Sequence, residues 1–208
     1  MASRLGDHTA RLQGRVTLNP MYHIDPVGSL LIPGLAIFGP LIGFTMLSGV
    51  LIGWAKPTPV ITRNFQKIRR DENLVTLAGP ASNLLIALIG LLVLVAISLF
   101  THDGHDLVLS TFAGGLALGV QSNTQAIILL AFLAILVNLS LFIFNLLPVP
   151  PLDGSYLLRN ILPYNAVQAY DRIPYWVSWI LMLVIGGFIM NLFLGPAMRA
   201  IYSLLQLL

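Results

Sequence analysis

Long apolar stretches dominate this chain and predict helices that cross a lipid bilayer. They lie at roughly Val27–Ala55, Leu74–Phe100, Ala126–Leu147 and Tyr175–Leu208. Each is longer than the ~20 residues that a transmembrane helix requires. The pattern therefore predicts an all-α polytopic membrane protein with about four membrane segments, built as a single domain over residues 1–208.

The first of these stretches is broken by helix-disrupting residues, namely Pro33, Gly34, Gly39, Pro40 and Gly43. Irregular backbone at membrane depth is tolerated only where protein buries it, so this segment is predicted to be kinked or re-entrant. A single crossing remains the alternative. The fourth stretch is predicted to be one helix that flexes at residues 186–187 and breaks near Gly195-Pro196.

A polar segment near the start of the chain, residues 14–26, is predicted to be extended. Val16, Thr17 and Leu18 favour a strand. The residues before Pro20 and Pro26 are also pushed out of the helical region of backbone conformation.

Composition supports the membrane class and excludes several functions. Hydrophobic residues make up 57% of the chain and charged residues 9%, against about 25% charged in a soluble domain. The chain has no cysteine, which excludes disulfides and thiolate metal sites. A net charge of +3 is too small to indicate a nucleic-acid surface, so the expected partner is the lipid bilayer.

The loop charges predict an orientation. Residues 56–73 carry five Lys or Arg and residues 148–174 carry two, whereas residues 101–125 carry none. The positive-inside rule therefore places 56–73 and 148–174 in the cytoplasm of a multi-pass protein, with the cell membrane as the expected location. The N-terminal arginines also favour the cytoplasm, which fits a first segment that enters and returns on the same side.

One carboxylate, Asp153, stands out because it follows an apolar helix directly, in the sequence Asn-Leu-Leu-Pro-Val-Pro-Pro-Leu-Asp-Gly (145–154). Charges in such positions are costly and often functional. Asp153 could ligate a cation from a turn that its prolines stiffen. It could instead cap a helix over Gly154–Leu162, and both interpretations remain open.

Other polar residues are weaker candidates. His23 and Asp25 share a face of an extended segment, where the carboxylate could orient the imidazole. A hydrogen-bonded turn is the favoured interpretation, since Asn19 and Asp25 each precede a proline. Asn83 and Asn145 lie in apolar stretches and could contact a substrate or orient a ligand, or simply form interhelical hydrogen bonds.

Two further patterns favour a structural explanation. Residues 102–106, His-Asp-Gly-His-Asp, resemble a metal cluster, but a solvated loop with a flexible glycine is the favoured interpretation. Asn138 shares a helical face with Asn145, and an interhelical hydrogen bond is favoured for it.

Four strings in order carry a family resemblance. They are Gly-Asp-His-Thr-Ala-Arg-Leu-Gln-Gly-Arg-Val-Thr-Leu-Asn-Pro-Met-Tyr-His-Ile-Asp-Pro-Val-Gly (6–28), Gly-Trp-Ala-Lys-Pro-Thr-Pro-Val (53–60), Ala-Gly-Pro-Ala-Ser-Asn (78–83) and the string at 145–154. From residue 3 to about 165, the chain resembles the site-2 protease family of intramembrane zinc metalloproteases, in its small form without a PDZ domain.

The resemblance implies a zinc site and a membrane-embedded peptide or protein substrate. In the family, a His-Glu-x-x-His helix supplies two zinc ligands and a general base, and the aspartate that matches Asp153 is the third ligand. The zinc-bound water attacks the peptide bond. Asn83 and Asn145 match positions near that site, and Asn19, His23 and Asp25 are the further candidates for supporting it.

The chain departs from the family pattern in one respect: it contains no His-Glu-x-x-His. Its only glutamate is Glu72, and no two of its four histidines are spaced i,i+4. We expect Met1 to be an internal methionine of a longer peptidase-like domain that is N-terminally truncated here. This polypeptide is then expected to bind zinc weakly or not at all and to be inactive.

Two other functions remain open. The first is a membrane scaffold without catalytic activity that could still bind transmembrane segments. The missing His-Glu-x-x-His motif supports this interpretation. A small transporter using Asp153 with Asn83 and Asn145 is compatible with broken helices. The in-frame codons ahead of Met1 distinguish the enzyme from the scaffold, and substrate-dependent flux in vesicles would indicate the transporter.

Overall fold

The computed structural model describes residues 1–17, 19–31, 35, 38, 56, 58–114 and 122–208. The chain divides into two compact units, Met1–Glu72 and Asn73–Leu208. Every regular element in the described residues is helical, which confirms the predicted all-α class.

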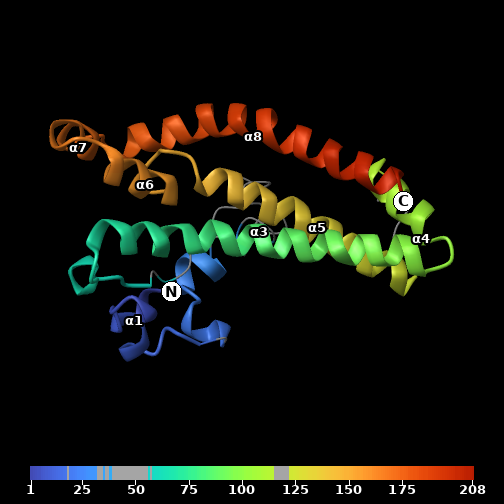
Figure 1. Cartoon of the computed structure of the whole chain (residues 1–208), viewed down its shortest axis with the longest axis horizontal. Coiled ribbons are helices and arrows are strands. Elements are labelled where there is room, and N and C mark those ends of the chain that lie inside the picture. The colour runs from blue at the N-terminus through green and yellow to red at the C-terminus, as the bar shows by residue number, and fades with distance from the viewer. Residues whose placement is uncertain (18, 32–34, 36–37, 39–55, 57, 115–121) are drawn as a thin grey trace. The chain divides into compact units, whose positions relative to one another are not determined.

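Three helices are long and apolar enough to cross a membrane: α3 (Ile68–Phe100), α5 (Asn123–Asn145) and α8 (Tyr175–Gln206). They coincide with the last three apolar stretches of the sequence (Figure 1). By their length and composition, the protein is an integral membrane protein. The predicted first segment lies mostly outside the described residues, so its kinked or re-entrant course stays a prediction.

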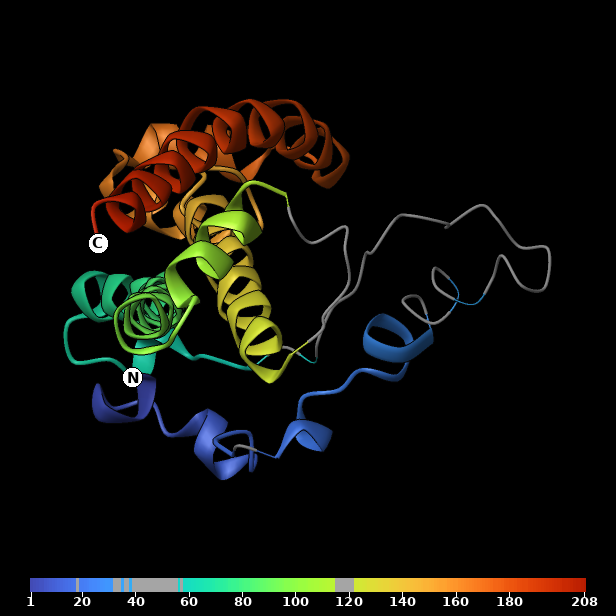
Figure 2. The same cartoon turned by 90° about the vertical axis from the view of Figure 1, so that its right-hand side faces the viewer.

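The second unit has two distinct ends. Short α4 (Gly104–Phe112) and the C-terminus lie at one end, and α6 (Asp153–Ile161) and α7 (Tyr164–Asp171) lie at the other (Figure 1). Helices α3 and α8 therefore run in the same direction and α5 returns between them. Figure 2, which views α3 nearly along its axis, shows α5 lying between α3 and α8.

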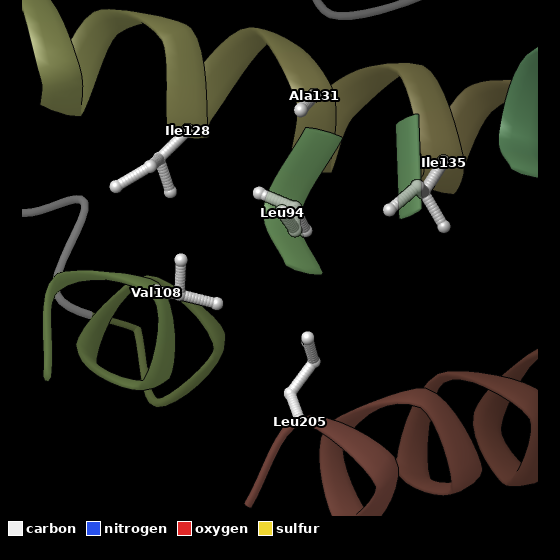
Figure 3. Close-up of a cluster of buried hydrophobic side chains, with 6 residues drawn as sticks. All are labelled: Leu94, Val108, Ile128, Ala131, Ile135 and Leu205. Atoms are coloured by element: carbon white, nitrogen blue, oxygen red, sulfur yellow. The ribbon is translucent and has the colours of Figure 1, made fainter. Parts of the chain in front are cut away.

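Apolar packing is concentrated at the α4 end of the second unit. Side chains from four helices meet there: Leu94 of α3, Val108 of α4, Ile128, Ala131 and Ile135 of α5, and Leu205 of α8 (Figure 3). All except Ala131 are fully buried. Because lipid is as apolar as these side chains, the contacts stabilise the unit through van der Waals packing and not through removal from water.

The outer faces of the three long helices are apolar as well. Leu92, Leu130 and Val184 each expose about two thirds of their surface. In water this would be an aggregation-prone surface, but lipid solvates it. The exposure pattern thus supports the bilayer as the solvent of these helices.

Helix α3 is too long to lie entirely in the hydrocarbon layer. Its 33 residues extend about 50 Å, against about 30 Å of hydrocarbon. Its first turns carry Arg69, Arg70, Asp71 and Glu72, so the excess length belongs at this end. The start of α3 therefore lies at the membrane boundary.

Three local expectations were wrong. Helix α8 continues through Pro196 without the predicted break, because a helix in lipid keeps its remaining backbone hydrogen bonds where water cannot replace them. Residues 14–26 form no strand where the structure describes them, and a 3-10 turn occupies Pro20–Tyr22. The predicted loop at residues 102–106 contains the start of α4.

A buried carboxylate, Asp7, holds the first unit together. It is 1% exposed and accepts four hydrogen bonds: from the backbone N–H and hydroxyl of Thr9 (3.1 and 2.5 Å), from the N–H of Ile61 (2.9 Å) and from Asn64 Nδ2 (2.9 Å). These donors, led by the Thr9 hydroxyl, hold the pKa of Asp7 far below its ordinary value. Asp7 thus ties α1 (Thr9–Leu12) to the 3-10 turn at Thr62–Asn64.

The packing at the α4 end makes a direct prediction. Leu94→Ala should lower the free energy of unfolding in detergent by about 2 kcal/mol, because it removes packing contacts and leaves a cavity. Leu92→Ala, in the same helix but on the exposed face, is the matched control and should change it little. Reversible unfolding of both variants measures the difference, and equal losses would contradict the packing described here.

A second prediction concerns Asp7. Asp7→Ala should leave buried donors unpaired and cost about 1–3 kcal/mol of local stability, measured as faster amide hydrogen exchange at Ile61 and Asn64. Asp103→Ala, whose side chain is 72% exposed, is the control. Because the pKa of Asp7 is lowered, its contribution is fully present above its ordinary value of 3.8 and disappears as pH falls through the lower folded value. Protection that is unchanged in Asp7→Ala would contradict this role.

Candidate functional site

The turn that carries Asp153 is firmly anchored. Leu147 and Val149 are each 3% exposed, and backbone hydrogen bonds join Val149 to Leu147 (2.8 Å) and Leu152 to Val149 (2.9 Å). The hydroxyl of Tyr170, in α7, donates to the carbonyl of Pro148 at 3.0 Å. The turn is therefore held from both sides and fixes where α6 begins.

Gly154 lets the start of α6 fold back onto the end of α5. A Cβ at this position would overlap the carbonyl group of Leu146 and lie 2.5 Å from the carbonyl oxygen of Leu147. No other residue fits so close to backbone. The glycine of the Leu-Asp-Gly string is thus a requirement of packing, and it brings residue 153 close to the end of α5.

Asp153 is the first residue of α6, and the N-cap is Leu152. Of the two interpretations left open, the one in which Asp153 caps a helix over Gly154–Leu162 is therefore wrong. Its side chain is half-buried, and no residue in the described part of the chain donates a hydrogen bond to its carboxylate. Burial raises the pKa of Asp153. Such a carboxylate is poorly stabilised in its charged form and would gain from a nearby cation.

The same carboxylate approaches α3. A Cβ on Gly79 would lie 3.1 Å from Asp153 Oδ2. Asn83 stands one turn further along α3 on the same face. Asn145, the last residue of α5, directly precedes the backbone that Gly154 contacts. Three of the predicted site residues thus come from elements that meet at the α6 end of the second unit.

A contact that the sequence analysis missed also joins α3 to α6. Asn160 Nδ2 donates to Asn73 Oδ1 at 2.7 Å. Neither residue lies in one of the four strings that carry the family resemblance or in one of the long apolar stretches. The sequence pattern therefore did not indicate this pair. An amide pair between distant positions leaves no local signature.

The remaining candidates, Asn19, His23 and Asp25, lie in the first unit. Asn19 Oδ1 accepts from the N–H of Met21 (3.0 Å), and Asp25 Oδ1 accepts from the N–H of Val27 (3.0 Å). His23 Nε2 lies 3.0 Å from the carbonyl oxygen of Thr17. These are the bonds of a turn, which was the favoured interpretation of this segment.

Other polar candidates have local partners. His102 and Asp103 are exposed and lie 2.9 Å apart, and His105 Nδ1 lies 2.9 Å from the hydroxyl of Ser98. Asn138 Nδ2 donates to the carbonyl of Ala134 within α5, in place of the expected interhelical bond.

The described residues do not by themselves fit a zinc ion. Catalytic zinc takes three protein ligands with an open position for water. Within the described ranges, no three His, Cys, Asp or Glu side chains are grouped so that they could hold a metal. Asp153 supplies a single carboxylate of the kind that zinc accepts.

Comparison with known proteins identifies the family. The sequence model of Peptidase family M50 matches residues 37–186. The chain belongs to this family. It is 38% identical over 163 residues to the Bacillus subtilis protein named "Putative zinc metalloprotease YwhC", which covers 78% of this chain and 61% of YwhC. It is 30% identical over 184 residues to a protein of the same description, Rip2 of Mycolicibacterium smegmatis, covering 88% of this chain and 58% of Rip2.

This chain therefore spans about three fifths of the length of these two relatives. No solved structure matches it significantly. Family membership confirms the resemblance to site-2 proteases inferred from the four strings.

The turn makes a prediction for this M50 chain. Gly154→Ala should disrupt the start of α6 and lower the melting temperature in detergent, because its methyl group would overlap two carbonyl groups. Gly187→Ala, in α8, is the control, since its Cβ would meet no atom within 4 Å. A Gly154→Ala protein as stable as the Gly187→Ala protein would contradict the described turn.

Proposed function

We propose that this protein acts as an intramembrane zinc metalloprotease of the site-2 type, and that Asp153 is one of its zinc ligands. The observation that carries the proposal is a half-buried carboxylate without a hydrogen-bond donor in the described residues, placed where α3, α5 and α6 meet. A carboxylate in these surroundings is better suited to binding a cation than to a structural role. The substrates are proposed to be transmembrane proteins or peptides.

The site is also at a suitable depth. Asp153 follows the turn after membrane helix α5, and it approaches α3 near the point where α3 leaves the hydrocarbon layer. Metal-dependent hydrolysis needs water as well as a membrane-embedded peptide. The membrane boundary provides access to both.

The other zinc ligands and the general base are proposed to come from outside these 208 residues. None of the four histidines forms an i,i+4 pair, and the single glutamate, Glu72, lies in a basic stretch. We therefore propose that the 208-residue polypeptide binds zinc weakly and has no peptidase activity on its own.

Supporting roles are proposed for polar residues near the site. Asn83 and Asn145 are half-buried, and the side chain of neither has a hydrogen-bond partner in the described residues. They could therefore bind the backbone of an unwound substrate segment. A supporting role for Asn19, His23 and Asp25 stays a proposal, and within the first unit these residues form the hydrogen bonds of a turn.

The proposed orientation places residues 56–73 and 148–174 on the cytoplasmic side of the cell membrane. The Asn73–Asn160 hydrogen bond supports a common side for the start of α3 and for α6. The positive-inside rule then selects the cytoplasm for both.

A membrane scaffold without catalytic activity is the second candidate function. It is favoured by the absence of a His-Glu-x-x-His string from the chain. The scaffold would bind transmembrane segments but never cleave them, whatever segment preceded it.

The experiment compares two forms of the protein on a transmembrane reporter peptide in detergent or vesicles. The first is the 208-residue polypeptide, and the second carries a His-Glu-x-x-His helix of the family grafted ahead of Met1. We expect zinc-dependent cleavage by the grafted form alone. In that form, Asp153→Asn should lower cleavage by more than the ~10–100-fold that losing a supporting residue costs.

Asp171→Asn in α7 is the matched carboxylate control, because this residue forms an exposed ion pair with Arg159, and it should leave cleavage nearly unchanged. Zinc-dependent cleavage by the 208-residue form would contradict the proposed source of the missing ligands. Full activity of the grafted Asp153→Asn form would contradict the role of Asp153.

A further inference from the structure

Two of the contacts in the described residues join α6 to the first part of α3. At one, the carboxylate of Asp153 fills the space beside Gly79, where a Cβ would lie 3.1 Å from Oδ2. At the other, the side chains of Asn73 and Asn160 are hydrogen-bonded at 2.7 Å. Both contacts lie inside the second unit of the chain.

The spacing of the contacts shows how the two helices run. Along α3, Gly79 follows Asn73 by six residues, or about 9 Å. Along α6, Asp153 precedes Asn160 by seven residues, or about 10 Å, which is two turns on one face. The helices therefore run antiparallel over this length, and α6 is held against α3 at both of its ends.

From this geometry we infer that Gly79 and the Asn73–Asn160 pair are positioning residues for the Asp153 carboxylate. The inference rests on the proposed function, in which that carboxylate binds zinc. The amide pair holds the far end of α6 against α3. The missing side chain at Gly79 leaves the space that the carboxylate occupies.

This role differs from ordinary packing of a small residue in a membrane helix. Gly90, in the same helix, is equally tight, since its Cβ would lie 3.0 Å from the carbonyl oxygen of Ala131 and 3.0 Å from Ile135. However, it faces α5, eleven residues away from Gly79. A methyl group at Gly90 would disturb helix packing, whereas one at Gly79 would displace a carboxylate.

The first test measures the reactivity of Asp153 itself, by labelling with a water-soluble carbodiimide and an amine and quantifying by mass spectrometry. Gly79→Ala should raise the labelling rate at Asp153 severalfold, because the new methyl group pushes the carboxylate away from α3. Asn73→Ala should also raise it, because α6 loses its hydrogen bond to Asn73 of α3. Gly90→Ala should leave the rate at the wild-type value while lowering the melting temperature at least as much.

A rate in Gly79→Ala that is unchanged or lower would overturn the inference, and so would an equal increase in Gly90→Ala. A merely structural role would move the melting temperature but not the labelling of one carboxylate.

The second test does not depend on the stability of the alanine variants. Since the chain has no cysteine, the pairs Gly79→Cys with Asp153→Cys and Asn73→Cys with Asn160→Cys can be cross-linked in native membranes by a short bifunctional thiol reagent. Both should cross-link within one chain, and Gly90→Cys with Asp153→Cys should not. Failure of either expected pair would overturn the inference.

Neither test requires zinc or peptidase activity. A protein that passed both tests but never cleaved a substrate would refute the proposed function and leave the geometry intact. A grafted form that cleaved its substrate, with labelling unaffected by Gly79→Ala, would refute the positioning role alone.

Discussion

The site depends on the close return of α6 onto the end of α5. Gly154 lies against the carbonyl groups of Leu146 and Leu147, and this contact sets the position of the residue before it. Asp153 is thereby held half-buried beside Gly79 of α3, without a hydrogen-bond donor in the described residues. A carboxylate in such surroundings is costly to maintain unless a cation stabilises its charge.

The two ends of the second unit are held by different physical interactions. At the α4 end, fully buried aliphatic side chains from four helices pack together. At the α6 end, a fixed turn, a tyrosine hydroxyl, an amide pair and two glycines set the geometry. Hydrogen bonds and close contacts at glycines fix the positions of side chains more narrowly than the packing of aliphatic side chains does. This suits the α6 end, which carries the proposed zinc ligand.

Much of this architecture could be predicted because the bilayer imposes strong constraints on sequence. Three long helices follow from apolar length alone, and Asp153 is conspicuous because charges beside such helices are rare. The continuity of α8 through Pro196 could not be predicted, since it depends on the surrounding lipid. The Asn73–Asn160 bond and the partners of Asp7 join positions far apart in sequence, so no local pattern indicates them.

If residue 153 supplies a zinc ligand, X-ray absorption at the zinc K-edge will detect a change of its donor atom. Asp153→Cys would introduce the only thiol in the chain, in a zinc-loaded form that carries the grafted His-Glu-x-x-His helix. We expect one sulfur scatterer at about 2.3 Å from zinc, absent from the parent protein. A spectrum with only nitrogen and oxygen neighbours in both proteins would contradict it.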